Sequence, residues 1–496
     1  MRNRTGRFLF LILLFAFLIR LYFALPGNVI LGFDQVRDLT ASWSIVRDMD
    51  IKIIGPTAGN NTDLHHGILF LYYILPPLTL FNGSAIAAIV WNLFFNALAA
   101  VVLFFFAKSL FKNFWSGIVS AILWAGSYYG VEYSSWISNP SPTLLTVPVC
   151  FWGMWEYLNG KRWGVYAAAF FLGLSIQFEL FFIYLIPFVL MFFFLSKARS
   201  IKDFLLSTIF FSVSASTMIL TEMKYKFSGV KYILGLVTGS SGRDFAGEVG
   251  LFTDRFFETY AQSIFPSPLG QLLGLIVFIF FAYLLFREKK HKKALIFMAV
   301  YLLSPFFMLL LGYHGAPWFL IALPPAMTLL TAFLLSRVFK IVAVVALIVI
   351  LTVNLNSLKK DKADKVSILE PDESAFLSSQ LGVVDYTYAS SGGSPFTVNS
   401  VTNPLYVNAV WSYHYKWYGE SKYGHLPSWS GGDQLHPYDF LPKAGGDEKF
   451  LYLVIDKTPR IPEVHKILAR NWANERSILI EIKDFGGIEV EKRKLR

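Results

Sequence analysis

Long apolar runs are the feature that most restricts the fold of this chain. They recur from the N-terminal region to about residue 355 and are roughly 17–20 residues long, the length that an α-helix needs to cross a hydrocarbon core of about 30 Å. Of the 496 residues, 55% are hydrophobic and only 16% are charged, whereas soluble domains carry about 25% charged residues. The sequence therefore predicts a polytopic α-helical membrane protein.

About eleven membrane-spanning helices are predicted. Residues 163–196 would form a hairpin with Gln177 and Glu179 at its tip. Residues 67–81 are too short to span and contain two prolines, so we expect a re-entrant or interfacial segment there. The predicted spans are 8–25, 84–107, 114–131, 140–158, 163–178, 180–196, 204–222, 268–286, 294–311, 317–334 and 338–355.

The short loops between these runs are basic, which predicts the orientation in the membrane. If the N-terminus is cytoplasmic, all the short Lys- and Arg-rich loops lie inside, as the positive-inside rule requires. The net charge of +11 then reflects orientation, and nucleic acid is not an expected partner. We expect the protein in the cytoplasmic membrane, with residues 26–83, 223–267 and 356–496 outside. The only cysteine, Cys150, falls in a predicted span, so no intramolecular disulfide can form.

The composition changes near residue 357 and divides the chain into two predicted domains. Residues 1–356 form the membrane domain. Residues 357–496 begin in a polar linker, NSLKKDKADK, and continue as a mixed α/β domain on the outer face. Within this domain, the Tyr- and Trp-rich segment 406–429 is typical of an aromatic belt at the membrane interface, with a carbohydrate-facing loop as the alternative. Strands are predicted in SPFTVNSV, KFLYLVI and SILIEIKDFGGIEVEKRKL, and a helix in IPEVHKILARNWANE.

The stretch GFDQVRDLTASW, residues 32–43, follows the first apolar run and holds two aspartates with an arginine between them. On a helix, spacings of three and four residues place Asp34, Arg37 and Asp38 on one face. A carboxylate just outside a membrane can act as a general base, because partial desolvation raises its basicity. The structural alternative is that Asp34 only caps a helix after Gly32 and that Arg37 and Asp38 form a surface pair.

A second polar segment lies in the same outer loop. Residues 53–81 combine a Gly- and Asn-rich turn, Asp63, the pair His65–His66 and an apolar dip toward the bilayer. Adjacent histidines point in different directions on a helix, so together they are poor chelators. We therefore predict that His66 and Asp63 belong to the site, and that His65 snorkels or hydrogen-bonds elsewhere.

Four pieces of the chain, in this order, resemble the bacterial protein mannosyltransferase-like glycosyltransferases, which have the GT-C fold. The resemblance covers about residues 5–355. It implies that Asp34 is the catalytic base and that the donor is a sugar linked to polyprenyl phosphate. Gln35 stands where relatives usually have Glu, and Glu179 where they often have His. The sequence requires no cofactor, and a divalent metal ion stays an open alternative. The four pieces are FDQVRD, HHGILFLYYILPPLTLF, YSSWISNPSPTLLTVPV and SIQFELFFIYLIP.

A lipid-linked donor also needs cations for its phosphate. Arginine grips a phosphate through two nitrogens, whereas lysine acts as a point charge. Contact with anionic lipid headgroups is the alternative role for such residues. The glycine-rich stretch 239–247 is a candidate gating loop over a bound donor. The candidate phosphate ligands of the outer loop 223–267 are Lys224, Lys226, Lys231, Arg243 and Arg255.

Three more polar residues lie at predicted outer span ends. Glu132, in the turn between the third and fourth spans, is a candidate for binding the sugar or a metal. In the same turn, Asn139 is expected to cap a helix. His314 stands beside Pro317 and Trp318 and is a candidate for phosphate contact, with a structural role as the alternative.

These features predict an integral membrane glycosyltransferase. It would transfer a sugar from a polyprenyl-phosphate carrier to a glycan, lipid or protein acceptor at the outer face, with inversion at the anomeric carbon and Asp34 as the base. The alternatives are a transporter or flippase for lipid-linked saccharides and a non-catalytic scaffold. Transporters place ionisable groups at the bilayer midplane, often in repeated halves, and neither pattern is visible. The predicted binding residues are Arg37, Asp38, Asp63, His66, Glu132, Lys224, Lys231, Arg243 and His314.

Overall fold

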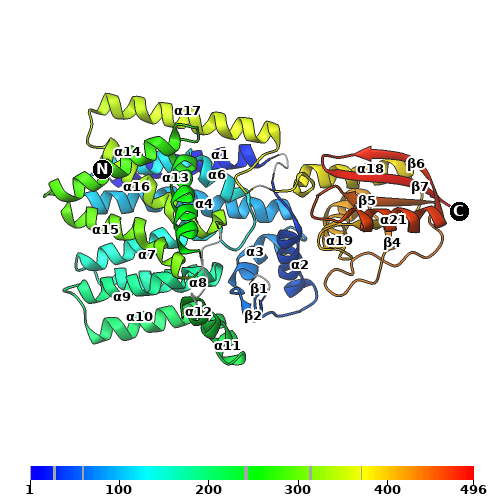
Figure 1. The fold of residues 1–496 in the computed structure, drawn as a ribbon, viewed down its shortest axis with the longest axis horizontal. Coiled ribbons are helices and arrows are strands. Elements are labelled where there is room, and N and C mark those ends of the chain that lie inside the picture. Colours follow the sequence, from blue (N-terminus) through cyan, green and yellow to red (C-terminus); the bar gives the residue numbers. More distant parts are fainter. Residues whose placement is uncertain (1, 26–28, 59–60, 239–243, 312–314, 370) are drawn as a thin grey trace.

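The computed structural model describes residues 2–25, 29–58, 61–238, 244–311, 315–369 and 371–496. A bundle of long apolar helices is joined at one end, here called the lobe end, to a smaller lobe built by the C-terminal residues (Figure 1). Among the described residues, five helices are long and apolar enough to cross a membrane, and several shorter apolar helices accompany them. The predicted polytopic α-helical architecture is confirmed at this level.

The helices of the bundle follow the predicted apolar runs closely. Helix α8, for example, has the bounds that were predicted for the fifth span. The main helices are α1 (Arg2–Ala24), α4 (Ala85–Phe111), α5 (Phe114–Ala125), α7 (Thr143–Leu158), α8 (Trp163–Phe178), α9 (Ile186–Leu195), α10 (Ile201–Ser214), α14 (Gly270–Arg287), α15 (Lys292–Leu303), α16 (Leu323–Leu335) and α17 (Lys340–Asp364).

Two predicted spans are broken in the structure. The run 114–131 stops at Ala125 and restarts as α6 (Tyr128–Ser135), because the Ser127 side chain caps the new helix through the amide of Gly130. Buried Arg20 of α1 donates to the carbonyl of Ala125 over 3.1 Å and so satisfies the end of α5. Further on, α10 bends by 73° into α11 (Ser216–Lys224).

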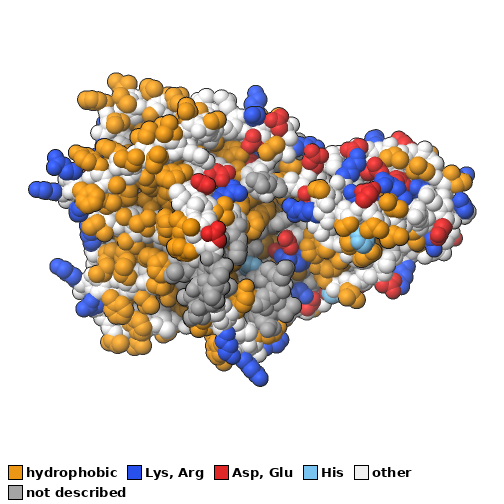
Figure 2. All heavy atoms as spheres, in the orientation of Figure 1, with side chains coloured by type: hydrophobic (Ala, Val, Ile, Leu, Met, Phe, Trp, Pro, Cys, Tyr) orange, Lys and Arg blue, Asp and Glu red, His pale blue; other side chains and the backbone are white. Residues whose placement is uncertain are grey.

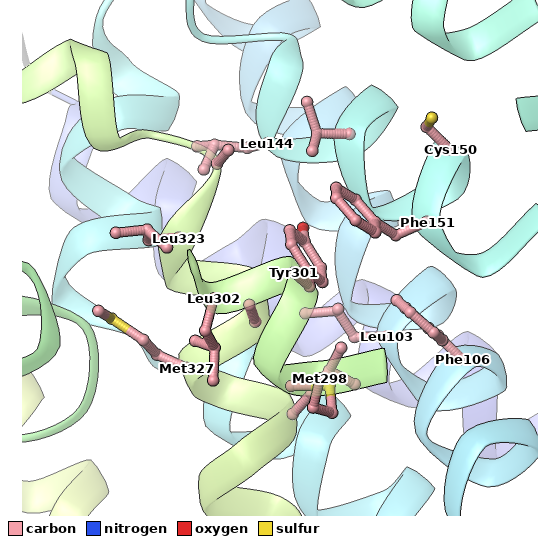
Figure 3. Packing of buried hydrophobic residues seen from close by; sticks show 14 of the residues in the cluster. Leu103, Phe106, Leu144, Cys150, Phe151, Met298, Tyr301, Leu302, Leu323 and Met327 are labelled. Atoms are coloured by element: carbon pink, nitrogen blue, oxygen red, sulfur yellow. The ribbon is translucent and has the colours of Figure 1, made fainter. Parts of the chain in front are cut away.

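Buried aromatic and aliphatic side chains join four helices at the centre of the bundle (Figure 3). Phe151 of α7 stacks on Tyr301 of α15 with ring centroids 3.7 Å apart. Leu103 of α4 and Leu323 of α16 are fully buried in the same cluster. The only cysteine, Cys150, is buried here too.

The polar segments outside the bundle are more helical than the sequence predicts. The loop 223–267 contains α12 (Ser228–Thr238) and α13 (Phe245–Ile264). The prediction that NSLKKDKADK is a linker is wrong, because α17 continues through this stretch to Asp364. The helix is capped by Lys365 in the left-handed conformation. Asn354 holds this long helix in place by accepting from the Tyr128 amide and donating to the Ile264 carbonyl. The first outer loop forms α2 (Phe33–Arg47), the hairpin β1 (Thr57–Ala58) and β2 (Asn61–His65), and α3 (Leu69–Leu80).

The C-terminal lobe is a five-stranded mixed sheet with helices on both faces. The strand order is β4-β3-β5-β7-β6. β3 pairs in parallel with β4 and β5, while β7 pairs antiparallel with β5 and β6. Every predicted strand and the predicted helix are present. Their bounds are β3 (Phe396–Val401), β4 (Ser428–Trp429), β5 (Phe450–Asp456), β6 (Ser477–Asp484), β7 (Ile488–Leu495), α18 (Leu377–Ser391) and α21 (Glu463–Arg476).

The aromatic segment 406–429 docks the lobe on the first outer loop. Trp411, Tyr413 and Trp417 are buried. The Tyr413 hydroxyl donates to the carbonyl of Gly83 over 2.6 Å, and its ring lies edge-on to Trp43 of α2. These rings therefore form an interface inside the protein, which differs from both the membrane belt and the carbohydrate loop that the sequence suggested.

Charge is distributed unevenly along the bundle axis. The bundle end opposite the lobe carries a fringe of Lys and Arg, whereas the lobe carries both signs (Figure 2). Short loops meet at the basic end: Lys293 of α15 donates to the Leu158 carbonyl at the end of α7, and Arg337 pairs with Glu288. One end of the apolar bundle thus collects the basic loops, and the opposite end bears the acidic first loop and the lobe.

Candidate functional site

The predicted acidic face exists at the start of α2. Arg37 bridges two carboxylates: its Nη1 is 2.7 Å from Asp34 Oδ1 and its Nε is 2.9 Å from Asp38 Oδ1. The two aspartates differ in environment, because the Asp34 side chain is 67% exposed and that of Asp38 only 6%. Asp34 is therefore available to a substrate, while Asp38 fixes Arg37.

The capping alternative for Asp34 is not what the structure shows. The N-cap of α2 is Gly32, and its amide donates to the Gln35 side chain over 3.0 Å. Gln35 thus closes the helix start in the way of a capping box. The Asp34 carboxylate, one position before Gln35, is directed to Arg37 instead.

Burial acts differently on the two members of the buried pair. Burial raises the pKa of the Asp38 carboxyl, although Arg37 opposes that shift. For Arg37, burial acts to lower the pKa, but Asp38 and Asp34 outweigh it and the net shift is upward. Arg37 therefore stays a full positive charge beside the exposed carboxylate of Asp34.

A second cluster, which we call the His66 triad, joins three segments distant in sequence: His66, Asn139 and Glu179. The Asn139 amide nitrogen is 3.3 Å from His66 Nδ1, 3.2 Å from Glu179 Oε2 and 2.8 Å from the Phe178 carbonyl oxygen. His66 Nδ1 also lies 3.8 Å from Glu179 Oε1. Asn139 therefore ties the first outer loop to the break between α8 and the short helix η1 (Leu180–Leu185), and it does not cap α7.

Burial shifts the pKa of both titratable members of the triad in the direction that favours the neutral form. Glu179 lies between two apolar segments, and burial raises its pKa to about 8. Burial lowers the pKa of His66 to about 4, helped by the charge of Arg37. A neutral carboxyl and a neutral imidazole offer a donor and an acceptor there without adding net charge.

The triad predicts a pH-dependent stability. A Glu179 pKa raised in the fold gives stability that is present below the unfolded value and is lost as the pH rises through about 8. His66 acts in the opposite sense, since its lowered pKa gives stability that is lost only as the pH falls through about 4. From pH 6.5 to 8.5 only Glu179 contributes, and we expect a loss of about 1–2 kcal/mol. Thermal unfolding across this range should show the decline in the wild type and not in Glu179→Gln; equal slopes would contradict the assignment.

The C-terminal lobe also contacts α2. Phe440 lies 5.8 Å from the Trp43 ring, and the Arg47 guanidinium sits 4.2 Å above Phe440. His436 Nε2 is 3.6 Å from an oxygen of Asp48. Between them, Tyr438 is half-buried, and burial raises its pKa, with Arg37 opposing the shift and Asp38 and Asp34 adding to it. Residues 436–440 of the lobe therefore pack against the C-terminal half of α2.

Some of the predicted phosphate-binding cations of segment 223–267 lie near the first outer loop. Helix α12, which carries exposed Lys231, packs on strand β2. Tyr225, next to Lys224, stacks on His65 at 4.9 Å, and Lys224 Nζ lies 5.7 Å from the Tyr225 ring. Arg255 pairs with Glu258 on its own helix. Segment 223–267 thus contacts segment 53–66, but no described contact joins its cations to Asp34.

The remaining predicted residues fall into two groups. Glu132 belongs to a separate buried network, where it accepts from the Ser367 hydroxyl over 2.6 Å and pairs with Lys362 at 3.3 Å, so it ties α6 to the last turn of α17 and to the segment that follows. Asp63 is described only as part of the backbone of β2. Arg243, most of the predicted gating loop and His314 lie outside the described residues.

The contact of Asn139 and Glu179 with His66 is the part of the site that sequence reasoning missed. The sequence places Glu179 at the tip of the predicted hairpin 163–196, and a carboxylate between two apolar runs is a signal for burial. Among the residues that the structure describes, no three His, Cys, Asp or Glu side chains lie close enough to hold a metal ion. A metal ion at this site therefore stays a prediction, and the described residues do not provide a full set of ligands for it.

Comparison with solved structures identifies the fold. The chain is similar to ArnT from Cupriavidus metallidurans in the apo state, with a TM-score of 0.59, 12% identity, and coverage of 99% of this chain and 98% of that one. The same protein bound to undecaprenyl phosphate gives a TM-score of 0.57 at 11% identity, with the same coverage. Neither a protein-family model nor a curated protein matches the sequence.

An archaeal protein shares the architecture more distantly. The oligosaccharyltransferase AglB from Archaeoglobus fulgidus, in complex with an inhibitory peptide and a dolichol-phosphate, matches with a TM-score of 0.50 and 10% identity. The match covers 98% of this chain and 74% of that one. At these identities the likeness establishes the fold, and the GT-C fold implied by the sequence resemblance is confirmed.

Proposed function

We propose that this chain of GT-C fold is a membrane glycosyltransferase that uses a sugar linked to polyprenyl phosphate. One observation carries the proposal. An exposed carboxylate, Asp34, lies 2.7 Å from an arginine that a buried second carboxylate holds in place. The fold supports the donor class, because the similar ArnT was solved with undecaprenyl phosphate and AglB with a dolichol-phosphate. The acceptor would be a glycan, a lipid or a protein.

The proposed reaction is a displacement at the anomeric carbon. Asp34 removes the proton of an acceptor hydroxyl as the acceptor oxygen attacks the anomeric carbon. The bond from that carbon to the phosphate oxygen breaks, and the phosphate takes the electron pair while Arg37 compensates its charge. Attack opposite the leaving phosphate inverts the anomeric configuration. The exposed Asp34–Arg37 pair opposes this binding only weakly, since exposed ion pairs contribute about 0–1 kcal/mol.

A transfer assay tests the function. Purified protein is incubated with a panel of polyprenyl-phosphate sugars and candidate acceptors, and the release of polyprenyl phosphate is measured. Release with at least one donor, lost in Asp34→Asn, is expected. Transport of a lipid-linked saccharide across proteoliposome membranes without release of the carrier would favour the flippase alternative.

We also propose eleven membrane crossings, with the basic loops in the cytoplasm and the lobe outside. The positive-inside rule supports this orientation, and so does the basic fringe at the end opposite the lobe (Figure 2). The number eleven is reached by counting shorter apolar helices and the bent pair α10–α11 as crossings, in addition to the five long apolar helices.

The orientation predicts the accessibility of single cysteines. Because Cys150 is buried and is the only cysteine, Cys150→Ala gives a clean background. Exposed Lys443 in the lobe and exposed Lys289 in a basic loop are each replaced by Cys. An impermeant thiol reagent should label Lys443→Cys in intact cells and Lys289→Cys only after permeabilisation. The reverse pattern would overturn the orientation and with it the outer-face chemistry.

A further inference from the structure

The C-terminal lobe holds the short stretch of chain that precedes α2. Ile30 forms an antiparallel bridge with Phe376, the residue just before α18. On either side of this pair, one backbone hydrogen bond joins the two strands. The bonds run from the Leu31 amide to the Ala375 carbonyl over 2.7 Å and from the Leu377 amide to the Val29 carbonyl over 3.0 Å. The chain therefore enters α2 as one strand of an interface with the lobe.

A buried glutamine of α18 fastens both strands of this bridge. Gln380 is only 3% exposed, and its Nε2 donates to the Leu31 carbonyl over 2.9 Å and to the Ser374 carbonyl over 3.0 Å. Leu31 is followed directly by Gly32, the N-cap of α2, and Asp34 lies in the first turn of the helix. The carbonyl that Gln380 holds is thus one residue before the start of the helix that carries the proposed base.

A second buried side chain fixes the orientation of the Gln380 amide. His414 is fully buried, its Nε2 lies 2.7 Å from Gln380 Oε1, and its Nδ1 lies 3.2 Å from the indole nitrogen of Trp417. Because an indole N–H can only donate, Nδ1 is the acceptor and Nε2 carries the proton that Gln380 Oε1 accepts. Burial lowers the pKa of His414 to about 3, which favours this neutral form. Trp417, His414 and Gln380 therefore form a directed chain of hydrogen bonds that ends at the Leu31 carbonyl.

We infer that Gln380 is a positioning residue for the proposed reaction, because it fixes the N-terminus of α2, and with it Asp34, against the lobe. The inference rests on the proposed function. A general base must lie within hydrogen-bond reach of the hydroxyl that it deprotonates, and a displacement of about 1 Å can cost about 100-fold in rate. A side chain that holds the start of α2 in place therefore acts on the rate through Asp34, without touching the substrate.

The apolar part of the interface does not set this position by itself. Leu31 and Val36 share a buried cluster with Leu377 and Trp417 of the lobe. Hydrophobic contact is non-directional, so it resists separation of the two surfaces more than a shift of one along the other. Hydrogen bonds depend on distance and angle, and the two that Gln380 donates supply the missing direction.

The test is Gln380→Met, which keeps the length of the side chain and removes both donors. We expect kcat to fall about 10- to 100-fold in protein that is folded at the assay temperature. The matched control is Tyr413→Phe, because it removes a different hydrogen bond between the lobe and the first outer loop, to the Gly83 carbonyl. Both variants should lower the temperature of unfolding, since each leaves a buried carbonyl without its donor, but only Gln380→Met should lose turnover. Equal effects of the two variants on turnover would overturn the inference.

A disulfide across the bridge gives a rescue that depends on position alone. The backbone hydrogen bonds flank the pair Ile30 and Phe376, and antiparallel pairs of this kind place their Cα atoms about 4.5 Å apart, within the range of a disulfide. In a Cys150→Ala background, Ile30→Cys/Phe376→Cys is combined with Gln380→Met. Oxidation, checked by mass spectrometry, should restore most of the turnover shown by the same cysteine pair with Gln380 intact, and reduction should remove the recovery. Oxidised protein without recovery would contradict the positioning role.

The outcomes keep the two proposals apart. Transfer by the wild type with an unchanged kcat in Gln380→Met overturns the inference and leaves the function standing. If the wild type transfers no sugar, the proposed function fails, and hydrogen exchange of the backbone still tests Gln380. The peptide that covers residues 29–38 should exchange faster in Gln380→Met than in the wild type and in Tyr413→Phe. Equal exchange in the three proteins overturns the inference as well.

Discussion

Asp34→Asn is expected to lower turnover by about 10²- to 10⁴-fold, the range for loss of a general base. Asparagine keeps the size of the side chain and one oxygen that can accept from Arg37, but it cannot take up the proton of the acceptor hydroxyl. The change should cost little stability, because the Asp34 side chain is 67% exposed and exposed ion pairs contribute about 0–1 kcal/mol. Release of polyprenyl phosphate from a purified enzyme measures the effect.

The structure separates the catalytic role of Asp34 from a helix-capping role, which the sequence alone did not do. A silent substitution could have been explained by a capping role, since Asn caps a helix as well as Asp. Here Gly32 and Gln35 form the cap, so Asp34 has no capping duty to preserve. Gln35→Ala is the matched control, and it should lower stability slightly without loss of turnover. Full turnover in Asp34→Asn would end the catalytic assignment.

Arg37→Met is expected to lower both stability and donor binding. Breaking a buried pair by removing one partner costs about 3–5 kcal/mol, because the other charge is left uncompensated. The carboxylate left behind is Asp38, whose side chain is only 6% exposed. The midpoint of thermal unfolding should therefore fall strongly at pH 8. The loss should shrink at pH 5, since burial raises the Asp38 pKa and the unpaired group can take up a proton.

A double variant separates the structural and functional roles of Arg37. In Arg37→Met/Asp38→Leu no buried charge is left, and replacing a buried pair by apolar side chains is often neutral. Stability should return toward that of the wild type, while donor binding should stay weak because the phosphate has lost its cation. Recovery of both properties would mean that Arg37 serves only to pair with Asp38.

The helices of the bundle were predictable because each long apolar run carries its own signal. A run such as 163–178 must hydrogen-bond its backbone internally in a bilayer, so its sequence fixes α8 without reference to other helices. The strands of the lobe were also predictable, since runs such as KFLYLVI are rich in β-branched and aromatic residues and are bounded by turn residues. The extension of α17 through NSLKKDKADK was not predictable, because this polar stretch makes tertiary contacts, such as the hydrogen bond from the Ser357 hydroxyl to the Pro266 carbonyl.

For the site, the sequence determined which residue types stand together on α2 and that they lie next to a membrane span. It did not determine that Asp38 is buried and Asp34 exposed, because desolvation depends on what packs above each carboxylate, and that packing is set by the tertiary structure. The His66 triad unites positions 66, 139 and 179. Only the tertiary structure brings these positions within hydrogen-bonding distance, since such contacts arise from chain packing and leave no local pattern in the sequence.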